Sequence, residues 1–189
     1  NARGINSLGQ TVGRSGTADS LDRAFVSNNG VMQDIGSLGG SYSEASDIND
    51  KGQIVGFSLT QNNGPFQAFL YDSANGMQDL GNLGGRTSEA QAINEYGQIV
   101  GSSKNINDQN RAFIYENGSM LDLTSLVEKK SLGDWILLNA MDINNNGWIV
   151  GTALNTTTQQ SHAYLLSVPV SEVPLPAPIL LFAPALVGL

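Results

Sequence analysis

The chain has 189 residues, which is enough for one ordinary hydrophobic core or for a short array of units that share one. Nine Lys and Arg stand against 17 Asp and Glu, so the net charge is -8; because nucleic-acid affinity depends on basic side chains that neutralise phosphates, no nucleic-acid partner is expected. Cysteine is absent, which excludes a disulfide framework, a thiolate nucleophile and a cysteine-based metal site.

The same phrase returns four times along the chain. Each copy reads Ile-Asn-x-x-Gly, then a Val-Gly pair, then a polar loop, then Ala followed by an aromatic residue. The Ile-Asn pairs begin at Ile5, Ile48, Ile93 and Ile143, in steps of 43, 45 and 50 residues. A fixed period of this length indicates a repeat architecture.

One repeat predicts four strands. Short runs rich in strand-forming residues, each bounded by turn residues, occupy residues 67–71, 77–81, 88–94 and 98–102. Small sheets of this kind cannot bury both faces alone, so they stack against one another, most often as propeller blades. We therefore predict an all-β, propeller-like array of about four repeats, each a small antiparallel sheet of about 44 residues, plus a C-terminal apolar tail.

The number of blades stays open at this stage. Fifteen strand-like runs are visible, whereas a ring of four blades needs sixteen. The sixteenth run is expected just before Asn1, and a larger ring is equally compatible. The chain begins inside a repeat, so we expect it to be part of a longer protein.

The turn between the last two strands of a repeat places Asn first and Gly fourth. This pattern predicts a type I turn that the Asn side chain caps, followed by a glycine with positive φ. The pairs are Asn49 and Gly52, Asn94 and Gly97, and Asn144 and Gly147, with residues 6–9 as a fourth copy. The Ala-x-x-Ile spacing before each turn breaks strict alternation by one residue and predicts a β-bulge.

Helix is expected only in residues 124–132. Ser125, followed three residues later by Glu128, suggests an N-terminal capping pair there. This insertion explains why the last repeat is longer.

The composition changes after Leu166. Five of the six prolines fall in the last 21 residues, beside an apolar stretch over residues 179–189. As a helix this stretch would span roughly 16 Å, about half of a bilayer core. We divide the chain into a β-repeat domain, residues 1–168, and a Pro-rich linker with the start of a hydrophobic segment, residues 169–189.

The C-terminal segment resembles the Val-Pro-Leu-Pro-Ala variant of the PEP-CTERM sorting signal of Gram-negative bacteria that make exopolysaccharide. The matching residues are Val173, Pro174, Leu175, Pro176 and Ala177. The resemblance implies export, a membrane contact only through this segment, and an exosortase-type processing enzyme as a partner. Pro178 and Pro184 depart from the usual helix, and the terminal Arg cluster is absent, which we attribute to truncation.

The repeats resemble the HAF family of bacterial extracellular proteins, named for a His-Ala-Phe triplet. Here the triplets begin at Arg23, Gln67, Arg111 and His162, and the Asp-Leu-Gly-x-Leu-Gly-Gly phrase also matches. The resemblance covers about residues 1–166. It implies export and a propeller-like structure, and it supplies no activity.

No catalytic residue is predicted. His162 is the only histidine and occupies a position that also holds Arg and Gln, so no Ser-His or Cys-His pair and no His-based zinc site is available here. Asp34, Asp79 and Asp122 recur at equivalent positions, and we expect each to accept backbone N–H groups of its own following turn. Glu44 and Glu89 recur in Ser-Glu-Ala and receive the same interpretation.

No cofactor is predicted, with calcium as the one alternative left open. Oxygen-bearing side chains gather near the turn glycines, at Asp47, Asn49 and Asp50 and again at Asp142, Asn144, Asn145 and Asn146. The spacing lacks the bidentate Glu of an EF-hand, and the turn at residues 6–9 has few ligands.

The sequence therefore predicts an exported, non-enzymatic structural or interaction protein of the bacterial envelope or exopolysaccharide matrix. The loops at residues 59–67, 104–111 and 153–162 are rich in Asn, Gln and Thr and should project from one rim. The alternative is a carbohydrate-active or glycan-binding propeller that uses rim carboxylates and these loops, with exopolysaccharide as its partner.

Overall fold

The computed structural model describes residues 1–168 and 180–182, so the sorting motif at residues 173–177 lies outside the described residues. The described part is all-β, as predicted: it holds sixteen strands, two short α-helices and the short 3-10 helix η1 (Gln61–Asn63).

Each successive group of four strands forms an antiparallel unit in which sequence neighbours pair. Unit 1 contains β1 (Ala2–Ile5), β2 (Thr11–Gly16), β3 (Asp22–Asn28) and β4 (Val31–Asp34). Unit 2 contains β5 (Gly39–Ile48), β6 (Ile54–Thr60), β7 (Phe66–Asp72) and β8 (Gly76–Asp79). Unit 3 contains β9 (Gly84–Ile93), β10 (Ile99–Asn105), β11 (Asn110–Glu116) and β12 (Ser119–Asp122). Unit 4 contains β13 (Trp135–Ile143), β14 (Trp148–Asn155), β15 (Ser161–Ser167) and β16 (Leu180–Phe182).

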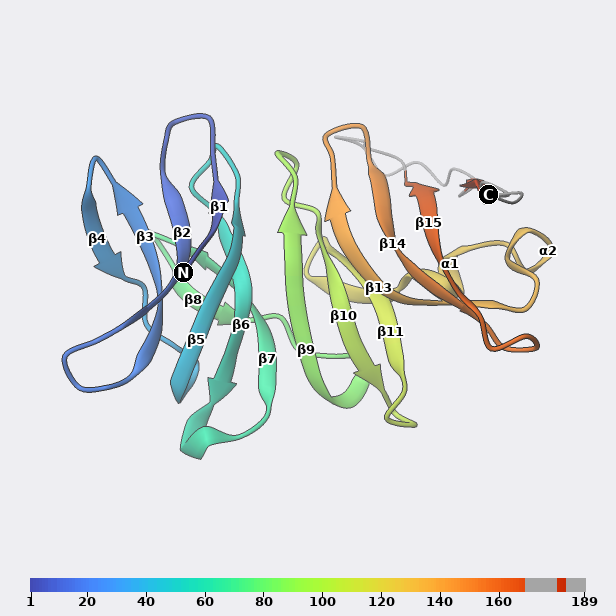
Figure 1. Cartoon of the computed structure of the whole chain (residues 1–189), viewed down its shortest axis with the longest axis horizontal. Coiled ribbons are helices and arrows are strands. Elements are labelled where there is room, and N and C mark those ends of the chain that lie inside the picture. The colour runs from blue at the N-terminus through green and yellow to red at the C-terminus, as the bar shows by residue number, and fades with distance from the viewer. Residues whose placement is uncertain (169–179, 183–189) are drawn as a thin grey trace.

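A single parallel pair, Asp22 with Tyr42, joins units 1 and 2, so backbone pairing divides the described strands into three sheets. Figure 1 shows the units side by side in sequence order, with units 1 and 4 at opposite ends. The described residues form no closed ring.

The units are out of phase with the repeat read from the sequence. Residues 67–102 were expected to form one sheet, but β7 and β8 belong to unit 2 whereas β9 and β10 belong to unit 3. The reason is that the linker between β8 and β9 crosses from one unit to the next. Its Leu80 is buried, and Leu83 is partly buried, in the core between those units.

The same shift changes how the first and last units are completed. Unit 1 already has four strands, and the strand that the last repeat lacks is supplied by β16. The backbone of β16 pairs with β15 through Leu181 and Leu166. These three residues of the apolar tail are therefore extended rather than helical.

The predicted helix is two short helices, α1 (Leu123–Leu126) and α2 (Lys129–Leu132), because Val127 between them is extended. The predicted capping pair is wrong. Asp122 caps α1 by accepting the N–H of Thr124, and the Ser125 hydroxyl instead donates to the Asp122 carbonyl.

The hydrophobic core is divided into three clusters, one for each pair of neighbouring units. Val12 and Ala24 of unit 1 pack with Ile48, Ile54 and Phe69 of unit 2, and equivalent residues repeat this arrangement twice. Each unit thus buries its faces mainly by packing against its neighbours.

Two local features of the repeat have clear causes. The predicted bulge is confirmed, because the pairing register shifts between Ala45 and Asp47 and at the equivalent places in units 3 and 4. The glycine of each Val-Gly pair lies against the neighbouring strand: a Cβ at Gly56 would lie 2.0 Å from the Glu44 carbonyl oxygen. A side chain is sterically excluded there.

Candidate functional site

The four asparagine turns share one hydrogen-bond pattern. In the second turn the Gly52 N–H donates to the Asn49 carbonyl at 3.1 Å, and the Asn49 Oδ1 accepts the N–H groups of Lys51 and Gln53. The fourth residue of every turn has positive φ; these residues are Gly9, Gly52, Gly97 and Gly147. The Asn side chain therefore holds its own turn, and glycine provides the left-handed backbone.

The same side chains also join the units, which the sequence did not indicate. The amide Nδ2 of Asn6 donates to the Asn49 carbonyl at 3.1 Å, Asn49 donates to Asn94 at 3.1 Å, and Asn94 donates to Asn144 at 3.3 Å. We call this series the asparagine ladder. Only the fold brings residues more than 40 positions apart into this line.

Two of the oxygen-rich residues considered as an alternative calcium site accept hydrogen bonds from other protein groups. The Asp47 carboxylate accepts the N–H groups of Ile48 and Ile93, and Asp50 accepts the N–H and hydroxyl of Ser7. Burial raises the pKa of Asp47. Among the described residues, no group of three or more His, Cys, Asp and Glu side chains lies close enough to hold a metal ion.

The three recurring aspartates each accept a backbone N–H two residues ahead, the role expected for them. Asp34 accepts from Gly36 at 2.7 Å, Asp79 from Gly81 at 2.8 Å, and Asp122 from Thr124 at 2.8 Å. Each carboxylate thus caps the start of the segment that follows its own strand.

Glu44 and Glu89 differ from each other despite their equivalent positions. The Glu44 side chain is only 4% exposed; it accepts a hydrogen bond from Tyr42 and from Arg3 Nε at 2.7 Å, and it forms an ion pair with Arg14 at 3.3 Å. Arg3 and Arg14 belong to unit 1, so this cluster, in which Glu44 is buried and Arg3 is half exposed, joins units 1 and 2. Glu44 was expected to serve its own unit, and that expectation is wrong.

The cluster perturbs the acid-base behaviour of its members. Burial opposes ionisation of Glu44, but the hydrogen bonds from Tyr42 and Arg3, together with the positive charges of Arg3 and Arg14, outweigh it and lower the pKa of Glu44. Burial, together with Glu44, raises the pKa of Tyr42 to about 12. Burial, with a smaller contribution from Glu44, raises the pKa of Glu89. Glu89 lines a small depression of about 320 Å³ that also touches Arg3 and Phe57.

His162 is exposed on β15, and its ring packs edge-to-face on Trp135 with the ring centroids 5.1 Å apart. In units 1 and 2 the equivalent Arg23 and Gln67 donate to the backbone carbonyls of Gly40 and Arg86. In units 1 and 2 this position thus makes contacts between strands.

The candidate binding site is a groove of about 500 Å³ between units 2 and 3. It lies on the rim opposite the asparagine turns, where the loops β2–β3, β6–β7, β10–β11 and β14–β15 all project (Figure 1). The three loops predicted from the sequence to share a rim do so, and two of them form the groove. Its lining residues are Leu59, Asn63, Gly64, Pro65, Phe66, Arg86, Thr87, Lys104 and Asp108.

One wall of the groove is apolar and fixed in place. The Phe66 ring packs edge-to-face against Tyr42 and Phe57, with ring centroids 5.6 Å and 5.4 Å apart. The Asn63 Oδ1 accepts the Ser41 N–H at 2.7 Å and anchors the loop tip. Side chains that are already fixed in one conformation lose little conformational entropy when a ligand binds.

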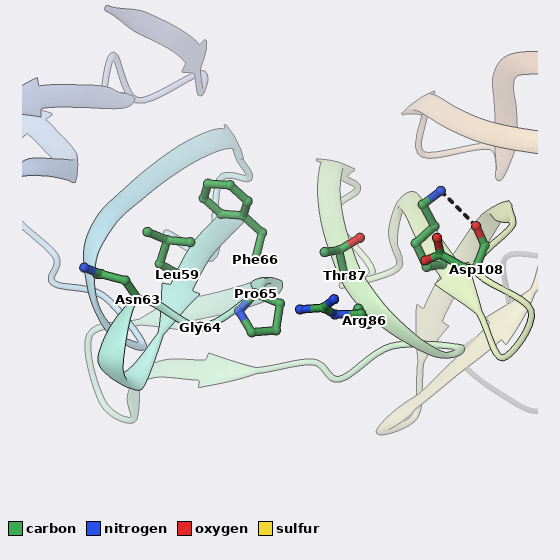
Figure 2. A pocket seen from close by; sticks show the side chains of 9 residues that line it. Leu59, Asn63, Gly64, Pro65, Phe66, Arg86, Thr87 and Asp108 are labelled. Carbon is green, nitrogen blue, oxygen red and sulfur yellow. Dashed lines mark hydrogen bonds between the residues drawn. The ribbon is translucent and has the colours of Figure 1, made fainter.

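The other wall is polar. Arg86 and Thr87 come from the start of β9, and Figure 2 shows the Arg86 guanidinium pointing across the groove toward Pro65. Lys104 Nζ donates to the Asp108 carbonyl at 2.9 Å. Arg86 and Thr87 could not be predicted as groove residues from the sequence, because they lie in a strand and line the groove only through the packing of unit 3 on unit 2.

Residues 2–168 match the family described as "Protein of unknown function (DUF3466)". The chain belongs to the DUF3466 family. The DUF3466 match covers β1 to β15 and so includes the asparagine ladder and the groove. No curated protein matches the chain. No helix among the described residues of this DUF3466 protein is long and apolar enough to cross a membrane.

Proposed function

We propose that this DUF3466 chain is a non-enzymatic interaction protein that binds an extended glycan in the groove between units 2 and 3. The observation that carries the proposal is the groove itself, which loops of two successive repeats form and which a fixed aromatic ring and several hydrogen-bonding side chains line. Binding sites of this kind combine apolar surface with a few polar groups that set orientation.

The arrangement of the carboxylates supports binding over catalysis. Glycoside hydrolysis requires two carboxyl groups on either side of one bond. The three recurring aspartates, Asp34, Asp79 and Asp122, instead lie in three different units, and each accepts a hydrogen bond from a backbone N–H of its own unit or of the segment that follows it. Among the residues that line the groove, Asp108 has the one carboxylate.

Binding to a panel of soluble polysaccharides, together with an assay for released reducing ends, tests this function. We expect binding without release, and Phe66→Ala should weaken it several-fold because the apolar wall is lost. Tyr96→Ala is the matched control, since Tyr96 is an aromatic residue 52% exposed on the opposite rim. The enzymatic alternative makes a different prediction. In that case the native chain releases reducing ends, and a triple variant with alanine at Asp34, Asp79 and Asp122 loses this activity while circular dichroism shows that it is still folded.

We further propose that the four units are blades of a propeller-like array. Neighbouring units pack through equivalent buried residues, and the asparagine ladder repeats the same contact at each junction. This regular side-by-side packing is how propeller blades bury their faces.

The place of action is proposed from the resemblance to HAF proteins and to the PEP-CTERM signal: export to the envelope, surface or exopolysaccharide matrix of a Gram-negative bacterium. Cell fractionation of the native protein, with and without residues 173–177, tests it. Retention of the protein in the cytoplasm, or unchanged processing without the motif, would contradict this assignment.

A further inference from the structure

The groove carries positive charge in an acidic protein. The chain has a net charge of -8, yet Arg86 and Lys104 both line the groove against the single carboxylate of Asp108. Among the described residues, Arg3, Arg14 and Arg111 are ion-paired with carboxylates, whereas Arg86 and Lys104 form no ion pair, like the four remaining basic residues outside the groove. Lys104 is held only by the Asp108 backbone carbonyl. Two cations are thus positioned at the groove and not neutralised.

Arg86 faces an apolar wall, whereas the Lys104 amine is directed toward the Asp108 carbonyl (Figure 2). Phe66, Leu59 and Pro65 form this wall, and Figure 2 shows the Arg86 side chain directed toward it. A pyranose ring has an apolar C–H face that packs on such a surface, while its polar edge remains available for hydrogen bonds. Asn63 and Thr87 are also lining residues, and amide and hydroxyl groups are the kinds of group that bind sugar hydroxyls.

We infer that the groove selects an acidic polysaccharide, in which an ionised sugar carboxylate pairs with Arg86 and Lys104 while the ring packs on Phe66. Arg86 offers the forked donors that match a carboxylate, and Lys104 adds a point charge. This inference rests on the proposed glycan-binding function and specifies its ligand class.

A matched pair of ligands tests the inference on the whole chain. Oligogalacturonate and the same oligomer with its carboxyl groups methyl-esterified have one backbone and differ in charge. With each exposed cation contributing about two- to fivefold in affinity, the acid form should bind about four- to twenty-fivefold more tightly in calorimetry at low salt. Arg86→Gln and Lys104→Gln should each remove about two- to fivefold of this preference and leave ester binding unchanged.

Two control variants separate charge from packing. Lys51→Gln removes an exposed cation from the asparagine-turn rim and should change neither affinity. Phe66→Ala should weaken both oligomers to a similar degree, because the apolar wall serves acid and ester alike.

The binding results distinguish failure of the charge selectivity from failure of glycan binding itself. Equal or tighter binding of the ester overturns the acidic selectivity and leaves the proposed glycan-binding function in place. Binding of neither oligomer, nor of any glycan in the wider panel, overturns both. Equal binding of polyglutamate shows that charge alone is recognised and overturns the assignment to a sugar.

Discussion

The asparagine ladder gives the strongest test of how the units are held together. Asn49→Ala removes four hydrogen bonds: the Oδ1 bonds from the N–H groups of Lys51 and Gln53, and the Nδ2 bonds to the Gln53 side chain and the Asn94 carbonyl. At about 1 kcal/mol for each hydrogen bond, we expect the free energy of unfolding to fall by about 4 kcal/mol. Asn49 is 3% exposed, so water cannot easily replace these bonds.

Asn144→Ala is the matched control, because Asn144 occupies the same position in the last turn. Its Oδ1 accepts the N–H groups of Asn146 and Trp148, but among the described residues its Nδ2 has no partner. Two hydrogen bonds are lost, so the expected decrease is about 2 kcal/mol or less. Urea unfolding followed by circular dichroism measures both values. If the two variants lose the same stability, the contact between units contributes nothing and the ladder argument fails.

Two further variants probe the packing and the buried charge. Gly101→Ala should destabilise the fold by about 3 kcal/mol or more in the same urea assay, since its Cβ would lie 2.0 Å from the Glu89 carbonyl oxygen. Gly16→Ala, where a Cβ would meet nothing within 4 Å, should cost little or should stabilise; equal losses would contradict the steric explanation. Because the pKa of Glu44 is lowered on folding, its ionised form contributes stability that is present above pH 4.5 and is lost as the pH falls. When thermal unfolding is measured between pH 6 and pH 3, the melting temperature should therefore fall less for Glu44→Gln than for the native chain. If the melting temperatures of the two proteins fall in parallel, the ionised Glu44 does not stabilise the fold.

The repeat made much of the fold predictable from the sequence. Strand positions, the glycine at the fourth place of each turn and the bulge beside Ala45 are local properties, since backbone geometry within a few residues sets them. The grouping of strands into units was not predictable in the same way. The grouping depends on the burial of Leu80 and Leu83 between units 2 and 3. A periodic sequence does not by itself show at which strand one unit ends and the next begins.

The candidate site was predictable only in part. The composition of the loops at residues 59–67 and 104–111 identified one rim as a binding surface, and both loops line the groove. Arg86 was not identified, because its role depends on the packing of unit 3 on unit 2. Glu44 and Glu89 look alike in sequence, yet only Glu44 meets two arginines, and those arginines lie about 30 to 40 residues away.

The segment that carries α1 and α2 lengthens the step between the last two asparagine turns to 50 residues, yet Asn94 still donates to the Asn144 carbonyl at 3.3 Å. Extra residues have therefore been accommodated without disturbing the junction between units 3 and 4. The junction is held by the turns themselves, and the length of the linker between them does not set their alignment. At this junction the alignment of the turns in space is therefore independent of their spacing along the chain.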